Sequence, residues 1–234
     1  MNIFMTIFFA LLLAVGIALL IVLQLPAFGR APRGKRLERI KQSPHYRNGR
    51  FHNIRNAPTL TSSKSLVQRM KEFIFDRPRR LKPSTPLPFV HTSLSTLAQA
   101  NDDVLVWLGH SSVFLKTDDL TFLVDPVFTT ASPFPWMFSP FKGSNGFTIE
   151  EVPPIDVLII THDHYDHLDY RTIKRLRQRV SRVVCPLGVG EHLERWGYPS
   201  DAITELDWDE SVLLDHKIQL HCLSTQHFSG RFLH

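Results

Sequence analysis

The chain has very little cysteine. Only two cysteines, Cys185 and Cys222, occur among its 234 residues. That number excludes a disulfide framework and a zinc site built from thiolates, and it suits a reducing compartment. The residues alone leave one disulfide open, but two buried free thiols are the prediction.

Acidic residues are scarce in the first 82 positions, which hold 16 Lys and Arg but only Glu38, Glu72 and Asp76. This part therefore carries a formal charge of +13, and the remaining residues, with 11 basic and 19 acidic side chains, carry −8. The basic character belongs to the front of the chain, which argues against a basic nucleic-acid-binding core. We expect no nucleic-acid partner.

Charge is missing altogether from Ile3 to Leu25. At 1.5 Å per helical residue this run would span about 34 Å, enough to cross a membrane. A cleaved signal peptide is the alternative, but it would want Lys or Arg ahead of a shorter apolar core and a small-residue cleavage site. No basic residue precedes the run, and the sequence LPAFG that ends at Gly29 is a poor cleavage site. We predict a retained transmembrane anchor over residues 1–29.

Six basic residues follow the apolar run within twelve positions: Arg30, Arg33, Lys35, Arg36, Arg39 and Lys41. Basic flanks stay on the cytoplasmic side, which predicts a single-pass protein with a cytoplasmic C-terminal part. The cluster would also attract anionic headgroups of a phospholipid membrane. A role in setting the topology is an equally good reading, and the two roles are compatible. We predict that residues 30–102 form this basic neck and an extended arm, with one helix from Ser65 to Phe75. The arm would lie on the domain or on the membrane.

A mixed domain is predicted over residues 103–234. Short β-type runs come first, separated by turn residues, and strand–helix–strand units follow. This order indicates an α/β fold with a mixed sheet covered by helices. The expected strands are Val104–Leu108, Ser112–Lys116, Leu120–Val124, Asp156–Ile160, Arg182–Cys185, Ala202–Leu206 and strands within Ser211–His227; the expected helices are Tyr170–Val180 and Gly190–Trp196.

The stretch THDHYDHLD, residues 161–169, follows the apolar run that ends at Ile160. Imidazoles and carboxylates are preferred ligands of Zn²⁺ and similar metals. His162 and His164 are two apart, so an extended loop would turn them to the same side, and Asp166 and His167 would then face a neighbouring point. The spacing therefore predicts a loop that serves two metal positions, where a bridging hydroxide is activated for hydrolysis.

The motif HDHYDH resembles the metal-binding motif of the metallo-β-lactamase superfamily. Further stretches resemble its branch of N-acyl-phosphatidylethanolamine-hydrolysing phospholipase D: residues 49–53 (GRFHN), 109–112 (GHSS), 125–128 (DPVF), 131–133 (ASP) and 225–227 (TQH). The resemblance covers the chain from about Gly49 onward. It implies the αββα sandwich of that superfamily, here with an incomplete second half and preceded by the transmembrane helix.

The resemblance also implies the roles of individual residues. His162, His164 and His227 would hold a first zinc, and Asp166 and His167, the implied catalytic residues, would contribute to a second. The resemblance also implicates two residues beside these ligands, Asp125 and His110. Asp125 would orient a ligating imidazole, whereas a structural role for His110 is an equally good interpretation. Asp163 alternates with the ligands and should therefore point away from the metals. Asp169 should cap the helix that starts near Tyr170; a hydrogen bond to a ligand is the alternative. His192 is expected to be an ordinary structural residue.

The chain departs from the superfamily pattern in its second half. The Asp that bridges both metals and the last His ligand cannot be placed, since His234 stands too close to His227. We therefore expect one or two zinc ions, with the second position incomplete. A half-finished second sheet would expose edge strands and apolar surface, which favours aggregation or pairing with another chain.

The function implied by the resemblance is that of a membrane-anchored, zinc-dependent phosphodiesterase acting on N-acyl-phosphatidylethanolamine-like lipids. Two alternatives stay open. One is a hydrolase of the same fold for a lactone, a thioester or a cyclic phosphate. The other is a truncated remnant without catalytic activity.

Overall fold

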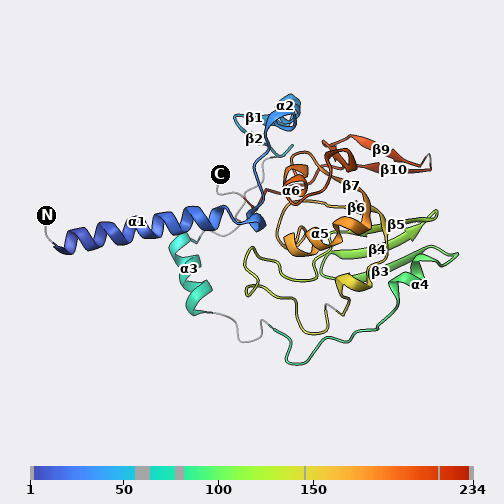
Figure 1. Cartoon of the computed structure of the whole chain (residues 1–234), viewed down its shortest axis with the longest axis horizontal. Helices are drawn as coiled ribbons and strands as arrows, with labels where there is room; N and C mark the ends of the chain where they lie inside the picture. Colours follow the sequence, from blue (N-terminus) through green and yellow to red (C-terminus); the bar gives the residue numbers. More distant parts are fainter. Residues whose placement is uncertain (1–2, 56–63, 77–81, 145, 216, 232–234) are drawn as a thin grey trace.

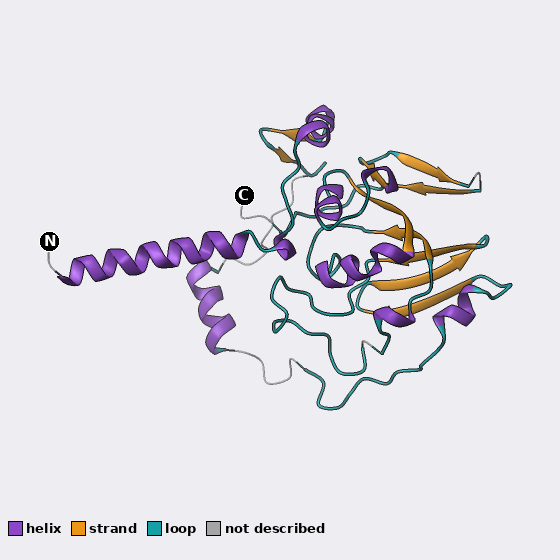
Figure 2. Ribbon diagram, viewed as in Figure 1, coloured by secondary structure: helices purple, strands orange, loops and turns teal. Residues whose placement is uncertain are grey.

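We analysed a computed structural model that describes residues 3–55, 64–76, 82–144, 146–215 and 217–231. The first two residues of the predicted anchor, parts of the arm, His216 and His234 lie outside these ranges, as does the side chain of Phe73. A long apolar helix projects from a domain of mixed sheet and helices (Figures 1 and 2). That domain is the α/β fold predicted from the sequence.

The central sheet has six strands in the order β3-β4-β5-β6-β7-β8. β3, β4 and β5 pair antiparallel, and β5 to β8 pair parallel. A hairpin of β9 and β10 forms a second, two-stranded sheet, and β1 and β2 form another. The strands are β1 (Tyr46–Arg47), β2 (Arg50–Phe51), β3 (Val104–Gly109), β4 (Ser112–Thr117), β5 (Leu120–Val124), β6 (Ile155–Ile159), β7 (Val180–Pro186), β8 (Ile203–Leu206), β9 (Ser211–Leu214) and β10 (Ile218–His221).

Three helices, α4, α5 and α6, cover one face of the central sheet (Figure 1). Their apolar side chains, such as Ile173 and Leu193, pack with Phe114 and Leu158 of the sheet in the main core. This core also takes in Leu94, which lies ahead of the predicted domain start. The helices are α1 (Ile3–Leu23), α2 (Gly34–Gln42), α3 (Leu66–Phe75), α4 (Leu94–Ala98), α5 (Tyr170–Leu176) and α6 (Gly190–Arg195).

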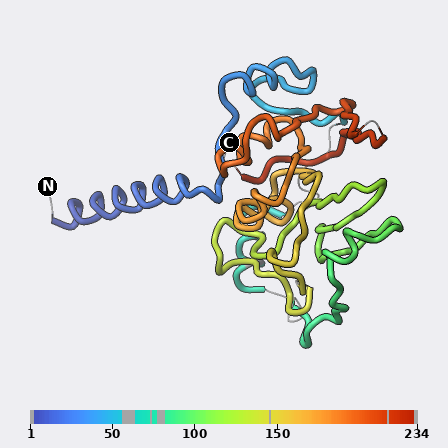
Figure 3. The backbone as a smooth tube through the Cα atoms, turned by 45° about the vertical axis from the view of Figure 1, so that its right-hand side comes forward, coloured from blue at the N-terminus to red at the C-terminus, as the bar shows by residue number. Residues whose placement is uncertain are grey.

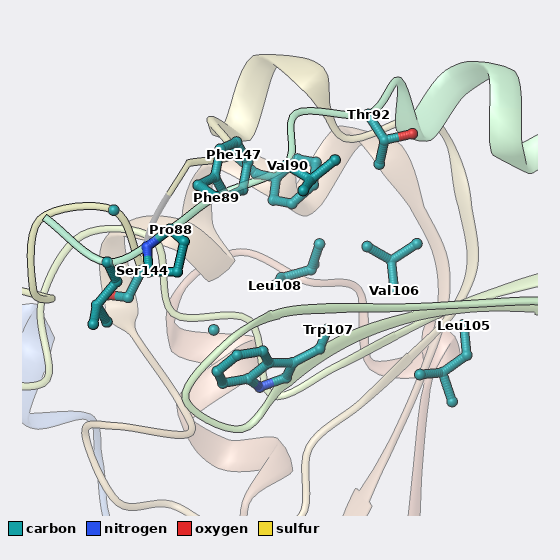
Figure 4. Close-up of a pocket in the computed structure, with 13 residues that line it drawn as sticks. Pro88, Phe89, Val90, Thr92, Leu105, Val106, Trp107, Leu108, Ser144 and Phe147 are labelled. Carbon is teal, nitrogen blue, oxygen red and sulfur yellow. The ribbon is translucent and has the colours of Figure 1, made fainter.

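The other face carries a smaller core, in which Leu214 of the hairpin packs on Phe122, Val157, Val184 and Leu206. Side chains of β3 alternate between the two faces, as strand geometry requires. Figure 4 shows Val106 and Leu108 pointing to one side, towards Phe147, and Leu105 and Trp107 to the other. The hairpin covers only part of this second face.

Local sequence signals predicted several helix ends correctly. Ser65 and Gln68 form a capping box at the start of α3, and the Asp169 side chain accepts from the Arg171 N–H as the N-cap of α5. The helix predicted to reach Val180 ends sooner, at Leu176. A 3₁₀ turn follows, and Val180 already belongs to β7. Cys185 and Cys222 are both free thiols, the first buried and the second half-buried.

The basic neck forms the helix α2, which the sequence reading did not predict. Its Arg36 donates to Glu191 and Glu194 at 2.6 Å each and to Glu205 at 2.5 Å. Arg30 and Arg33 also lie within 3.5 Å of Glu191, whose side chain is almost fully buried. The neck is therefore bound to the domain by ion pairs, and these three guanidinium groups are engaged by protein carboxylates.

Candidate metal centre

The motif loop leaves the carboxyl end of β6, beside the end of β5. Parallel β5 and β6 are in register. Asp125, directly after β5, and Thr161, two residues after β6, therefore meet at one edge of the sheet, where sites in α/β folds gather. Asp125 accepts from the Thr161 N–H at 2.7 Å and from its hydroxyl at 2.6 Å. Within the loop, the Leu168 N–H donates to the His164 carbonyl at 2.8 Å. These bonds fix the loop as a tight turn.

Three histidines converge although one of them is more than sixty residues away in the sequence. Ring centroids are 4.8 Å apart for His162 and His164, 4.3 Å for His162 and His227, and 4.4 Å for His164 and His227. Each offers one nitrogen, and these nitrogens lie within 4.8 Å of one another. The structure thus brings together the three residues that the resemblance implied for a first metal.

The chemistry of this donor set fits a metal ion. Burial, together with the imidazoles of His167, His227 and His164, lowers the pKa of His162 to about 4, and burial lowers that of His164 as well. Both rings are therefore neutral at pH 7, as a metal ligand must be. The buried Nε2 of His164 has no hydrogen-bond partner among the described residues, which is costly unless an ion takes that place.

Two further groups with ligand atoms within 4.8 Å lie beside this cluster. His110, Asp166 and His167 form one, and Asp125, His162 and His167 form the other. His110 stands on the β3–β4 turn, and its Nε2 lies 3.0 Å from Asp166 Oδ2. Burial raises the pKa of Asp166, but hydrogen bonds and the nearby His167 and His110 outweigh it and lower this pKa. Asp166 is therefore ionised, as a carboxylate ligand needs to be.

Asp125 lies where it can orient His167. Its carboxylate is buried, and Oδ2 lies 2.8 Å from His167 Nδ1. A carboxylate at Nδ1 favours the tautomer with the proton on that nitrogen, which leaves Nε2 as the ligand atom. His167 Nε2 lies 4.0 Å from Asp166 Oδ2. The geometry is that of a carboxylate–histidine–metal arrangement, although the role of each residue stays a prediction.

A buried network behind the loop was missed by sequence reasoning. Asp163 accepts from Ser229 Oγ and, at 3.2 Å, from the Gly230 N–H. Arg231 donates to the carbonyls of Asp163 at 2.6 Å, of Leu168, and of Ala27 at 2.6 Å. Burial lowers the pKa of Arg231 to about 10, so it stays charged at pH 7. This network holds the His227 segment against the motif loop, and no local sequence signal marks Arg231.

His192, expected to be structural, is part of the same support. Its Nδ1 accepts from the Arg30 N–H at 3.0 Å, and its Nε2 lies 3.8 Å from Asp163 Oδ2. Gly29 has a φ of +73°, and a side chain there would collide with the His192 ring. The segment directly after α1 therefore packs against the support of the metal loop.

An apolar cavity of about 530 Å³ opens beside the histidine cluster. Its walls come from the ends of β6, β7 and β8 and from the segment after β10. His162 and His227 lie at its edge, and the apolar lining includes Ile160, Val184, Leu206, Trp208, Leu220 and Leu223. An apolar group of a substrate would fit next to the metal ligands.

Comparison with known proteins identifies the family. Residues 121–234 match the family model described as "Beta-lactamase superfamily domain". The chain belongs to the metallo-β-lactamase superfamily. An uncharacterized protein of Mycobacterium tuberculosis is 35% identical over 196 residues, which cover 82% of this chain and 52% of that protein. The central mixed sheet is accordingly the metallo-β-lactamase fold predicted from the motif.

Two relatives with named activities also match this superfamily member. N-acyl-phosphatidylethanolamine-hydrolyzing phospholipase D 1 of Caenorhabditis elegans is 32% identical over 140 residues, covering 54% of this chain and 38% of that protein. A carrier-protein 3-hydroxylase of Streptomyces venezuelae is 34% identical over 149 residues, covering 63% and 27%. The chain spans about half the length of the mycobacterial relative and less of the other two.

Proposed function

We propose that this protein is a membrane-anchored, zinc-dependent hydrolase that cleaves a phosphodiester of N-acyl-phosphatidylethanolamine-like lipids. One observation carries the proposal: a buried arginine links the motif loop of the histidine cluster to the segment that leaves an apolar helix. α1 is 21 residues long with a mean hydropathy of 3.0 over its best window, sufficient to cross a membrane by length and composition. Arg231 joins the carbonyl of Ala27, four residues after α1, to that of Asp163 in the motif.

In this proposal α1 is retained in the membrane, and the domain lies in the cytoplasm because of the basic residues after α1. The relative from C. elegans supports the substrate class, since its name specifies hydrolysis of N-acyl-phosphatidylethanolamine. The same motif would serve a lactone, a thioester or a cyclic phosphate in a different pocket. Proximity to lipid favours the phospholipid.

The residues divide the work as follows. His162, His164 and His227 would hold one ion, and Asp166 and His167, with His110 beside them, would hold a second. Bound zinc would supply a Lewis acid for the phosphoryl oxygens and lower the pKa of water. Asp125 keeps the proton of His167 on Nδ1. Asp166 and His167 bring a carboxylate oxygen and Nε2 to the space where water and phosphate would meet.

Purified full-length protein in detergent tests this proposal. Metal content is measured by elemental analysis, and turnover is measured with N-acyl-phosphatidylethanolamine. His162→Ala combined with His164→Ala should abolish both, whereas His91→Ala, an exposed histidine bound to Glu151, should change neither. An unchanged hydrolytic rate in the double variant would refute the metal mechanism. Metal retention without lipid turnover would favour another substrate, and a lack of both in the unmutated chain would favour an inactive remnant.

A further inference from the structure

An uncharged stretch of the connection between β5 and β6 exposes several large apolar side chains. Positions 126 to 141 contain no charged residue, and residues 134–141, FPWMFSPF, are called here the aromatic loop. The Trp136 side chain is 75% exposed. The others exposed in this loop are Met137, Phe138 and Phe141. Clustered exposure of this kind marks a surface that meets a partner or a membrane.

The aromatic loop lies next to the segment that leaves α1. The Phe134 ring lies 6.0 Å from the ring of Phe28, which is itself 6.4 Å from Tyr165 of the metal motif. Figures 1 and 3, two views 45° apart, both place residues of this loop on the side of the domain from which α1 projects. The loop is thus continuous with the end of the helix that we assign to the membrane.

α3 presents a second apolar surface on the same side. Its exposed apolar residues recur at helical spacing: Leu66, Val67, Met70 and Ile74, with Phe75 at its end. The side chain of Arg69, on a different side of the helix, is half-buried. In Figure 1, α3 runs crosswise to α1 on the side of the domain from which α1 projects. A helix crosswise to a membrane span lies along the membrane surface, where amphipathic helices bind with their apolar side.

We propose that the aromatic loop and the apolar side of α3 insert into the interfacial region of the membrane that α1 spans. The partner is a phospholipid bilayer, because the aromatic loop contacts Phe28 just after α1, because α3 lies on the side of the domain from which α1 projects, and because Trp and Phe suit the interfacial region. The proposal rests on the part of the proposed function that retains α1 in the membrane. It adds that the metal motif, whose Tyr165 ring packs next to Phe28, faces the headgroups. A lipid can then reach the motif without leaving the bilayer.

Quenching of tryptophan fluorescence by brominated phospholipids tests the loop. The full-length protein is reconstituted into phosphatidylcholine vesicles with and without bromine on the acyl chains. Trp136→Phe should remove most of the quenching. Trp107→Phe is the matched control, since Trp107 is 65% exposed but lies on β3, and it should leave quenching nearly unchanged. Equal quenching in the unmutated protein and in Trp136→Phe would overturn the proposal for the loop.

A tryptophan moved onto α3 tests the helix. In the Trp136→Phe background, Val67→Trp should restore quenching. Glu72→Trp, on the other side of α3 where Glu72 pairs with Lys64, should not. Equal quenching at the two positions would overturn the proposal for α3. Because quenching requires no turnover, an inactive protein with quenched Trp136 refutes only the proposed activity. An active protein whose Trp136 is not quenched refutes only this inference.

Discussion

The two faces of the central sheet are covered very differently. On one face, α4, α5 and α6 bury an extensive core that includes Phe114, Leu123 and Leu158, all with almost no exposure. On the other face, the β9–β10 hairpin packs on residues of β5 to β8, and Leu105 and Trp107 of β3 remain exposed. The fold therefore draws most of its hydrophobic stabilisation from the helical face.

The candidate metal centre lies between these two faces of the sheet. Its support comes from the helical side, where the Asp169 carboxylate accepts from Thr172 Oγ1 at 2.6 Å and from Thr129 Oγ1 at 2.7 Å. The cavity beside His162 and His227 opens on the side of the hairpin. A rigid loop beside an open cavity is the arrangement that a site needs in order to hold its ligand atoms and still admit a substrate.

The largest expected effect is the loss of a large side chain from the helical face. Phe114→Ala would leave a cavity in the main core, where Phe114 is fully buried. We expect the free energy of unfolding to fall by about 3–5 kcal/mol. Urea unfolding in detergent micelles, followed by far-UV circular dichroism, measures this change. A loss below about 1 kcal/mol would mean that the two faces contribute similar stability and would break the comparison.

The elements that sequence predicted well are those coded locally. The six main strands and the cap of α5 followed from short apolar runs and from Asp169 next to Tyr170. α2 was missed, since its stability comes from Arg36 meeting Glu191 and Glu205, about 160 residues away. Such pairs leave no periodic signal in the chain.

The candidate site shows the same division. The HDHYDH spacing and its family resemblance predicted the loop and selected His227, which the structure places beside His162 and His164. The buried network behind the motif loop could not be predicted, because Arg231 donates to backbone carbonyls. Every residue has a carbonyl, so the sequence does not mark the acceptors. Asp163, expected to point away from the metals, accepts a hydrogen bond from the Gly230 N–H. This interaction depends on the fold having formed.

A smaller effect is expected from Asp125→Asn, which tests the helical-side support of the metal centre. The amide keeps one acceptor oxygen where the carboxylate has two, so it cannot accept fully from both Thr161 and His167. It also removes the charge that makes the imidazole a stronger ligand. We expect zinc affinity to fall about 10–100-fold, measured by competition with a chelator.

Asp102→Asn provides the control for that measurement, because Asp102 is exposed ahead of β3, and its zinc affinity should match that of the unmutated protein. If Asp125→Asn binds zinc as tightly as this control does, the support of His167 by Asp125 contributes nothing to the site. The support of the motif loop would then be attributed to the hydrogen-bond network of Asp163 and Arg231.

The smallest effect is expected on the open face. Leu105→Ser changes a side chain that is 69% exposed on β3, and exposed substitutions usually alter the free energy of unfolding by less than about 0.5 kcal/mol. The same urea experiment used for Phe114→Ala measures it. A loss above about 1 kcal/mol would show that this face is covered in the assembled protein, since only a buried leucine contributes that much. Such a result would mean that the helical face is covered by the chain itself, whereas the face of the hairpin is completed by contact with a second chain.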